Sequence, residues 1–375
     1  MNDARCDALI VGGGPAGSSC AWALCRAGLD VWVLDKKEFP RDKVCAGWIT
    51  PPVLEVLQID HADYARHHVL QPITGFCSGR IGDRAIETKY SDIVSYGIRR
   101  REFDHYLLQR SGARLLLGEP LTSIERQNGN WLINKHIETP LLIGAGGHFC
   151  PVARHLGADV GSGEPAVIAR EVEFPMSTAQ QSCCRAAAER PELYFCADLK
   201  GYGWVFRKGD YLNIGLGRED SHRLAEHSAA FISWLKTEGK IPADVTESFK
   251  GHAYLLYSHG KRKLLDDGVL LLGDAAGLAY PHSGEGIRPA IESGLMAAET
   301  VIAANGDYGA DKLERYRNRL INRFGAATTE SAQLIPDVLR HFIGERLLDN
   351  RWLTRHVLLN HWFLHRHQPA LKMAS

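Results

Sequence analysis

The sequence has no excess charge of one sign and no long apolar run. Its 375 residues include 44 Lys and Arg against 44 Asp and Glu, for a formal net charge of +0. Nucleic-acid binding needs a concentrated positive surface, so nucleic acid is not an expected partner. No stretch reaches the roughly 18 consecutive apolar residues of a membrane-spanning helix. We therefore expect a globular protein with one large core or two joined cores.

The chain also lacks the cysteine spacing of a metal site or of a disulfide framework. Its cysteines are odd in number and scattered, without the paired spacing of zinc ligands. We expect no secretory signal before the first apolar run, and thiols stay reduced in the cytosol. The sequence therefore predicts a reduced, cytoplasmic protein without a metal site.

The first glycine cluster follows a short apolar run near the N-terminus. Residues 7–11 have the length and composition of a buried parallel strand. Gly12, Gly14 and Gly17 follow with the spacing G-x-G-x-x-G. In this pattern the glycines permit a tight turn, the approach of backbone to a pyrophosphate, and the packing of helix on strand. The segment therefore predicts a phosphate-binding turn.

The residues after this turn complete a dinucleotide-binding unit. Residues 18–27 are typical of a helix whose N-terminal N–H groups face the phosphates. Residues 31–34 form a second expected strand, which Asp35 closes. A carboxylate there accepts hydrogen bonds from the ribose hydroxyls of an adenosine and repels the 2′-phosphate of NADP. We therefore expect an α/β, Rossmann-type domain that binds a dinucleotide other than NADP.

A second glycine-rich segment repeats the order of strand, turn and helix. Residues 269–272 form the expected strand, Gly273 and Asp274 follow, and a helix is expected from about Glu285. Gly286 would bring the N-terminus of that helix close to a ligand that carries negative charge. The segment predicts a second contact with the same cofactor.

A third strand–glycine segment, residues 141–147, lacks the G-x-G-x-x-G spacing, and no strand with a terminal acid follows it. We interpret it as a strand of the same domain and not as a second nucleotide site. If the bound dinucleotide is a redox cofactor, the chain has no second site for a nicotinamide, so NAD(P)H as the electron donor must bind transiently. Alternatively, the electrons come from a protein carrier of the ferredoxin or flavodoxin type.

Aromatic and β-branched stretches between turn residues predict a mostly antiparallel sheet over 166–218. Tyr202, Trp204 and Phe206 alternate within one of these stretches, so their side chains share one face of a strand. That face lines a cavity or packs in a core.

Four motifs can be matched to a known family. They are "DKKEFPRDKVCAGW", which contains Cys-x-Gly, the helix "RREFDHYLL", the sheet segment "GYGWVFRKGDYLNIGLG", which matches at Tyr202, Trp204, Phe206 and Lys208, and "GDAAG" followed by "PHSGEGIRPAIESG". Together they resemble the geranylgeranyl reductase family of FAD-dependent oxidoreductases, a branch of the para-hydroxybenzoate-hydroxylase-like flavoproteins. The resemblance covers residues 5 to about 330.

The resemblance implies an FAD cofactor and a Rossmann-type domain with an inserted, mostly antiparallel β-sheet substrate domain and a C-terminal helical tail. The expected bounds are 1–70, 97–160 and 259–330 for the FAD domain, 71–96 and 161–258 for the substrate domain, and 331–375 for the tail.

The resemblance also assigns site residues. Asp274 would bind FAD near the ribityl–pyrophosphate junction, and Arg101 would reach the phosphates. The expected FAD-binding residues are Gly12, Gly14, Pro15, Ala16, Gly17, Asp35, Lys36, Arg41, Cys45, Ala46, Gly47, Arg101, Gly273, Asp274, Gly284, Glu285, Gly286 and Ile287. This chain departs from the family at Arg207, where relatives have proline. It departs again at Gly146, where relatives have an aspartate that contributes to FAD and nicotinamide contacts.

Cys45 allows three interpretations. A metal ligand is disfavoured because no second ligand lies at a usable spacing, and a structural disulfide is disfavoured in the cytosol. Cys45 is then either a small buried packing residue or the wall of an active site beside the flavin, with Trp48 next to it. We predict Cys45, Tyr202 and Trp204 as catalytic residues.

Three functions remain open from the sequence. The first is a reductase in which reduced FAD gives hydride to a carbon–carbon double bond of a hydrophobic, for example prenyl, substrate. The second is a flavin monooxygenase that hydroxylates a small or carrier-bound aromatic substrate with O₂. The third is a protein that binds FAD without turnover.

The C-terminal segment 336–372 has apolar residues at near-helical spacing and Arg and His on its other faces. Such a basic amphipathic segment can lie on an anionic membrane surface. Alternatively, it packs on the FAD domain or on a second subunit. His365 and His367 lack a facing Cys or Asp cluster, so they predict no metal site.

Overall fold

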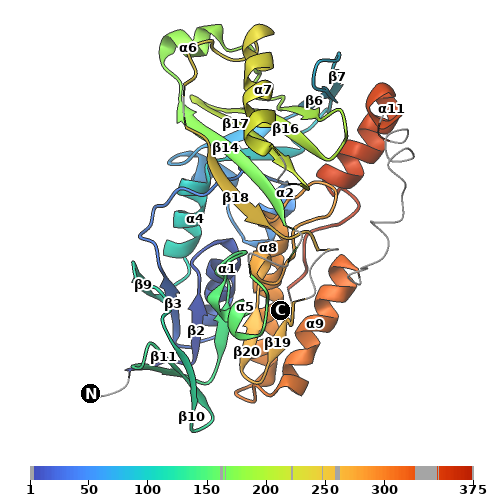
Figure 1. Ribbon diagram of the computed structural model, residues 1–375. Coiled ribbons are helices and arrows are strands. Elements are labelled where there is room, and N and C mark those ends of the chain that lie inside the picture. Colours follow the sequence, from blue (N-terminus) through green and yellow to red (C-terminus); the bar gives the residue numbers. More distant parts are fainter. Residues whose placement is uncertain are drawn as a thin grey trace.

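The computed structural model describes residues 4–373, except 161–163, 165, 221–222, 247, 258–261, 326–343 and 345. Figure 1 shows two large sheets, one below with helices packed against it and one above. The first part of the expected helical tail, up to residue 343, lies outside the described residues.

The lower sheet is the predicted Rossmann-type sheet. Its six strands have the order β19-β20-β13-β2-β3-β9, and every pair is parallel except β19 with β20. Its central strands are buried on both faces, which explains their continuous apolar sequences. The strands are β2 (Ala8–Val11), β3 (Val31–Asp35), β9 (Arg114–Leu117), β13 (Leu142–Gly144), β19 (Leu265–Asp266) and β20 (Val269–Leu271).

Helices cover this sheet. Gly294 lets α1 and α8 approach closely, because a Cβ at this position would lie 2.3 Å from the Ala16 carbonyl oxygen. Helix α1 begins at Pro15, three residues earlier than predicted, and Gly286 is the N-cap of α8. The helices are α1 (Pro15–Arg26), α4 (Arg100–Gln109), α5 (Pro151–His155), η1 (Gly273–Ala275), α8 (Ile287–Ala304) and α9 (Ala310–Phe324).

The upper sheet has seven strands in the order β18-β14-β17-β16-β15-β6-β7, all antiparallel except the pair β15 with β6. Helices α6 (Thr178–Cys183) and α7 (Leu224–Thr237) lie on the side away from the lower sheet (Figure 1). The strands are β6 (Gly75–Arg80), β7 (Ile86–Lys89), β14 (Val167–Pro175), β15 (Glu192–Phe195), β16 (Gly201–Lys208), β17 (Tyr211–Arg218) and β18 (Lys250–Tyr254). The domain bounds stay a prediction.

Two small sheets complete the strands. The first has the order β1-β12-β11-β10, and the second, β4-β8-β5, carries the segment after Cys45. The bounds are β1 (Ala4–Arg5), β10 (Ile124–Gln127), β11 (Asn130–Ile133), β12 (Ile137–Thr139), β4 (Trp48–Ile49), β5 (Leu70–Ile73) and β8 (Ser95–Ile98), with helices α2 (Pro51–Val56) and α3 (His61–Ala65).

The described part of the tail packs on the upper sheet. Helix α11 (Arg351–Leu353) continues into the π-helix η2 (Thr354–Phe363), and Figure 1 shows this segment beside the sheet. Leu358 and Phe363 join the apolar cluster that contains Trp204 and Phe206. Of the expected apolar positions, Trp352 is 63% exposed. No helix among the described residues is long and apolar enough to cross a membrane.

Candidate active site

A cavity of about 380 Å³ lies between the glycine-rich turn of the lower sheet and the aromatic face of the upper one. Gly17, Gly47, Arg101 and Gly273 are the predicted site residues that do not line it. The predicted residues that do line it are Gly12, Gly14, Pro15, Ala16, Asp35, Lys36, Arg41, Cys45, Ala46, Tyr202, Trp204, Asp274, Gly284, Glu285, Gly286 and Ile287.

The glycines of the first turn have different tasks. A Cβ at Gly12 would lie 2.4 Å from the Ala145 carbonyl oxygen, and one at Gly17 would lie 2.0 Å from that of Gly12. These two glycines are therefore needed to build the turn itself. A Cβ at Gly14 would meet only the Arg41 guanidinium, at 3.4 Å. Gly14 thus leaves space on the cavity side of the turn, where a ligand can approach the backbone.

Asp35 is fixed at the end of β3. One carboxylate oxygen accepts a hydrogen bond from the backbone N–H of Gly13 at 2.8 Å, and the other accepts one from Lys37 at 2.9 Å. Each oxygen keeps a lone pair for a further donor. The carboxylate is therefore held in place and can still accept hydrogen bonds from ribose hydroxyls.

Two arginines share one buried carboxylate beside the turn. Arg100 donates two hydrogen bonds to Asp104, at 2.7 and 2.9 Å, and Arg41 pairs with the same carboxylate at 3.4 Å. The group carries one net positive charge, and both arginines line the cavity. The expectation for Arg101 is corrected here: Arg101 is exposed and pairs with Asp42 at 3.3 Å, so Arg100 is the arginine of α4 that faces the cavity.

A lysine, a histidine and an aspartate meet in the middle of the cavity. Lys43 Nζ lies 2.7 Å from His252 Nε2, and this histidine nitrogen lies 3.7 Å from Asp274 Oδ2. Burial lowers the pKa of Lys43 to about 8. Burial by itself would raise the pKa of Asp274, but the nearby His252 imidazole and the charge of Lys43 lower it to about 2. Sequence reasoning found Asp274 and missed two residues: Lys43, which lies within the Cys-x-Gly motif but was given no role, and His252, which lies outside the four motifs.

The Glu285 carboxyl borders the cavity next to the N-cap of helix α8. Both of its carboxylate oxygens are buried and accept no hydrogen bond from any residue in the described part of the chain. Burial raises the pKa of Glu285 to about 7. Nearby, the Tyr202 hydroxyl donates a hydrogen bond to the Ser283 carbonyl at 2.5 Å, which connects the upper sheet to this segment.

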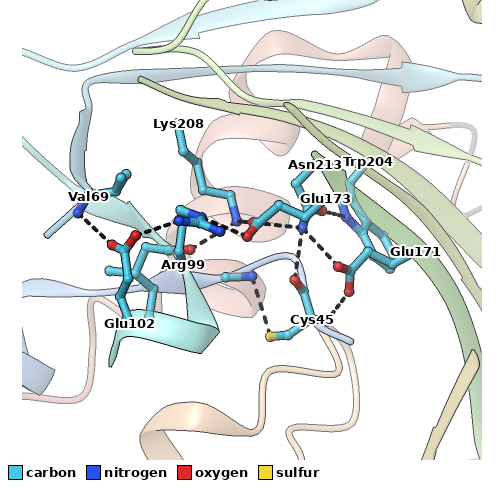
Figure 2. A network of polar contacts seen from close by, with 11 residues as sticks. Cys45, Val69, Arg99, Glu102, Glu171, Glu173, Trp204, Lys208 and Asn213 are labelled. Carbon is cyan, nitrogen blue, oxygen red and sulfur yellow. Dashed lines mark hydrogen bonds and ion pairs between the residues drawn. The ribbon is translucent and has the colours of Figure 1, made fainter. Parts of the chain in front are cut away.

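A polar network holds the turn that contains Cys45 (Figure 2). The backbone N–H of Cys45 donates a short hydrogen bond to Glu171, and the Gly47 N–H donates to the Cys45 sulfur at 3.4 Å. All nine cysteines are free thiols. Among the described residues, no group of three or more His, Cys, Asp or Glu side chains could hold a metal ion.

The aromatic face of β16 both lines the cavity and packs in a core, the two uses expected from the sequence. Tyr202 and Trp204 line the cavity. Phe206 does not line it; this residue is 1% exposed and lies in the same apolar cluster as Trp204, with its ring 5.8 Å from that of Trp48. A Cβ at Gly215 on the neighbouring strand would lie 2.1 Å from the Trp204 indole. Glycine at this position therefore makes room for Trp204 to lie across the sheet.

Glu171 on β14 predicts a pH dependence of stability. Burial raises its pKa from 4.5 to about 7. Because the folded pKa exceeds the unfolded one, this group stabilises the fold fully below its unfolded pKa. That stabilisation is lost as the pH rises through the folded pKa, and it amounts to roughly 3 kcal/mol. We expect Glu171→Gln to remove this part of the decline in unfolding free energy between about pH 4.5 and 7.

Urea unfolding at the two ends of this pH window measures the effect. Glu125→Gln, on the exposed strand β10, is the matched control and should keep the wild-type pH dependence. A Glu171→Gln protein with the same slope as wild type would contradict the assignment of a protonated, buried carboxyl.

Comparison with known proteins decides the family. A family model described as FAD dependent oxidoreductase matches residues 7–102. Geranylgeranyl diphosphate reductase of Rhodobacter capsulatus is 31% identical over 324 residues, which cover 79% of this chain and 75% of that protein. The chain belongs to the geranylgeranyl reductase family. It is an FAD-dependent oxidoreductase, and the expectation of FAD as cofactor is confirmed.

Solved structures agree on the fold of this geranylgeranyl reductase family member. A geranylgeranyl bacteriochlorophyll reductase-like protein from Thermoplasma acidophilum superposes with a TM-score of 0.73 at 22% identity, covering 92% of this chain and 88% of that one. A probable FAD-dependent monooxygenase from Pseudomonas aeruginosa, pqsL, has a TM-score of 0.66 at 20% identity, covering 94% and 99%. These likenesses confirm the predicted fold class.

The cavity residues fit FAD. The open side of Gly14 and the positive charge of Arg41 and Arg100 suit a pyrophosphate. Asp35 suits the adenosine ribose, and the unpartnered Glu285 carboxyl suits a hydroxyl or N–H donor. The individual FAD contacts stay predictions.

Proposed function

We propose that the protein is a reductase that saturates a carbon–carbon double bond of a hydrophobic, prenyl-type substrate. The observation that carries this proposal is the aromatic wall of the cavity, formed by Trp48, Tyr202 and Trp204. Such a wall offers a long alkene a large apolar contact area and few polar partners. The similarity to geranylgeranyl diphosphate reductase supports the same substrate class.

Bound FAD, once reduced, would supply the hydride. The chain would hold it through Asp35 at the adenosine ribose and through Arg41 and Arg100 at the pyrophosphate. Trp204 and Tyr202 would position the alkene and exclude water. Reduction adds hydride to one carbon and a proton to its neighbour, and we assign delivery of that proton to the Cys45 thiol. The thiolate then regains its proton from solvent.

The electron donor is part of the proposal. This chain has Gly146 at the position where the family resemblance implies an acid that contributes to nicotinamide contacts. We therefore favour a protein carrier of the ferredoxin or flavodoxin type over direct use of NAD(P)H. Contact of the C-terminal segment with a membrane surface, from which a prenyl lipid could enter, stays a prediction.

Product analysis tests the proposed reaction. Chemically reduced, FAD-loaded protein is mixed anaerobically with geranylgeranyl diphosphate, and the product is examined by mass spectrometry. We expect products that carry added pairs of hydrogen atoms. Unchanged substrate, together with an oxygenated product when air is admitted, would favour the monooxygenase that the sequence left open.

Trp204 predicts a loss of turnover. Trp204→Ala removes one of the two indoles of the aromatic wall, so we expect kcat/KM to fall at least about tenfold, roughly 1.4 kcal/mol. FAD should stay bound, because Trp204 lies on the sheet opposite the glycine-rich turn. Phe206→Leu is the matched control on the same face of β16, since Phe206 packs in the core and does not line the cavity. It should lower the melting temperature more than the turnover of the folded fraction. The reverse pattern in the two variants would assign Trp204 to the core.

A further inference from the structure

We propose that Asn213 is a positioning residue that fixes the Cys45 turn relative to the Trp204 indole. The catalytic meaning of this inference rests on the proposed function, in which Cys45 and Trp204 act on the substrate. Its structural part, that one amide holds the turn, can be tested without substrate. Asn213 lies in the segment that carries the sheet motif, but it is not one of the positions that match the family.

Asn213 connects two cavity-lining residues from distant parts of the chain (Figure 2). It lies on β17, opposite Glu173 of β14 and Phe206 of β16, and is 0% exposed. Its amide oxygen accepts a hydrogen bond from Trp204 Nε1 at 2.8 Å, and its amide nitrogen donates to the Cys45 carbonyl at 3.1 Å. The same side chain therefore holds the wall of the cavity and the turn with the thiol.

The amide chemistry explains why asparagine is suited to this place. The nitrogen also lies 3.2 Å from Glu171 Oε1 and 3.2 Å from Glu173 Oε2, so its two hydrogens serve three acceptors. A carboxylate could accept the indole N–H but could not donate to the Cys45 carbonyl. An aliphatic side chain could do neither.

The surroundings hold the amide in one orientation. Glu173 is fixed by Lys208 at 2.6 Å and by Arg99 at 3.2 Å, and Lys208 also donates to the Ile98 carbonyl at 2.9 Å. Glu171 accepts the Cys45 N–H, so both backbone polar groups of Cys45 bond to this network. A buried polar network whose members are satisfied specifies one geometry. The Cys45 turn is therefore held by the upper sheet.

Loss of the amide would release the turn and leave the cofactor cradle intact. The Cys45 carbonyl and the Trp204 N–H would each lose their partner. Within the described part of the chain, the Asn213 side chain forms its hydrogen bonds with Trp204, Cys45, Glu171 and Glu173, and none with Asp35, Arg41 or Arg100. We expect Asn213→Ala to lower kcat with little change in FAD affinity. In a Cys45→Ala background the same substitution should cost little further turnover, because no thiol remains to be positioned.

Alkylation of Cys45 provides the test that does not depend on turnover. FAD-loaded wild type and Asn213→Ala are treated with iodoacetamide, and the modification of the Cys45 peptide is followed by mass spectrometry. Asn213→Ser carries the test if the alanine variant does not fold. We expect alkylation about fivefold faster or more, the factor that follows from losing one net hydrogen bond.

The control is Tyr194→Phe, which removes a buried 2.5 Å hydrogen bond to Glu192 in the cluster on the other face of the upper sheet. It should leave Cys45 alkylation at the wild-type rate. An unchanged rate in the FAD-loaded Asn213 variant, or an equal acceleration in the control, would overturn the inference. If wild type forms no hydrogenated product, the proposed function fails, and the alkylation rates alone decide the role of Asn213.

Discussion

Gly14→Val is expected to give folded protein that has lost FAD, with affinity reduced at least about a hundredfold, roughly 2.7 kcal/mol. The backbone of Gly14 has φ −74° and ψ −176°, a conformation open to valine. Its Cβ would meet only the Arg41 guanidinium, and the side chain would occupy the space where the pyrophosphate is expected. The fold should therefore survive while the cofactor is displaced.

Absorbance of the purified protein and titration with FAD measure this loss. Gly251→Val is the matched control, because a Cβ at this exposed position of edge strand β18 has no neighbour closer than 4.0 Å. It should bind FAD like wild type. Stoichiometric FAD in the Gly14→Val protein would show that the turn does not hold the pyrophosphate.

Cys45→Ala is expected to keep FAD bound and reducible while turnover falls at least about tenfold, roughly 1.4 kcal/mol. The turn is held through the backbone N–H and carbonyl of Cys45, and alanine keeps both groups. The loss would therefore report on the thiol and not on the position of the turn.

Rapid mixing of the reduced protein with substrate measures the rate at which the substrate is reduced. Cys77→Ala is the control, since Cys77 is a half-buried free thiol on β6 that does not line the cavity. It should turn over like wild type. If Cys45→Ala matched wild type, Cys45 would be only a packing residue.

Local patterns in the sequence were sufficient to predict the strand–turn–helix–strand unit of the FAD domain. Gly12, Gly14, Gly17 and Asp35 lie within one strand–turn–helix–strand unit, so their spacing alone defines their geometry. The aromatic alternation on β16 was likewise readable, because side chains in a strand alternate between faces. Both features depend on contacts that are close in sequence.

The prediction that Arg101 reaches the FAD phosphates was wrong, since Arg100 is the arginine of α4 that lines the cavity. Adjacent residues on a helix point in directions about 100° apart, so the choice between them depends on how α4 is rotated against the lower sheet. That rotation is set by Phe103 and Leu107, which are buried in the neighbouring apolar cluster. The family motif Arg-x-x-Phe-Asp, counted back from Phe103, has its arginine at Arg100, so the assignment to Arg101 was also off by one residue in the sequence.

The polar partners of Cys45 and Asp274 could not be predicted from the sequence for a different reason. Lys43 meets His252, and Cys45 meets Asn213, only after β14, β17 and β18 have paired in register. Single side chains of this kind carry no periodic signal. One hint was available: Asn213, Gly215 and Gly217 alternate on β17, so the glycines that make room for Trp204 place Asn213 on the same face.

The central claim is that the reduced flavin is oxidised by hydride transfer to a carbon–carbon double bond. Flavin absorbance after anaerobic mixing of the reduced protein with geranylgeranyl diphosphate tests it most directly. We predict that the oxidised flavin spectrum returns without oxygen, in proportion to the double bonds reduced, and that it returns more slowly in Trp204→Ala and Cys45→Ala. A flavin that stays reduced until air is admitted, and then hydroxylates an added substrate, would contradict the account.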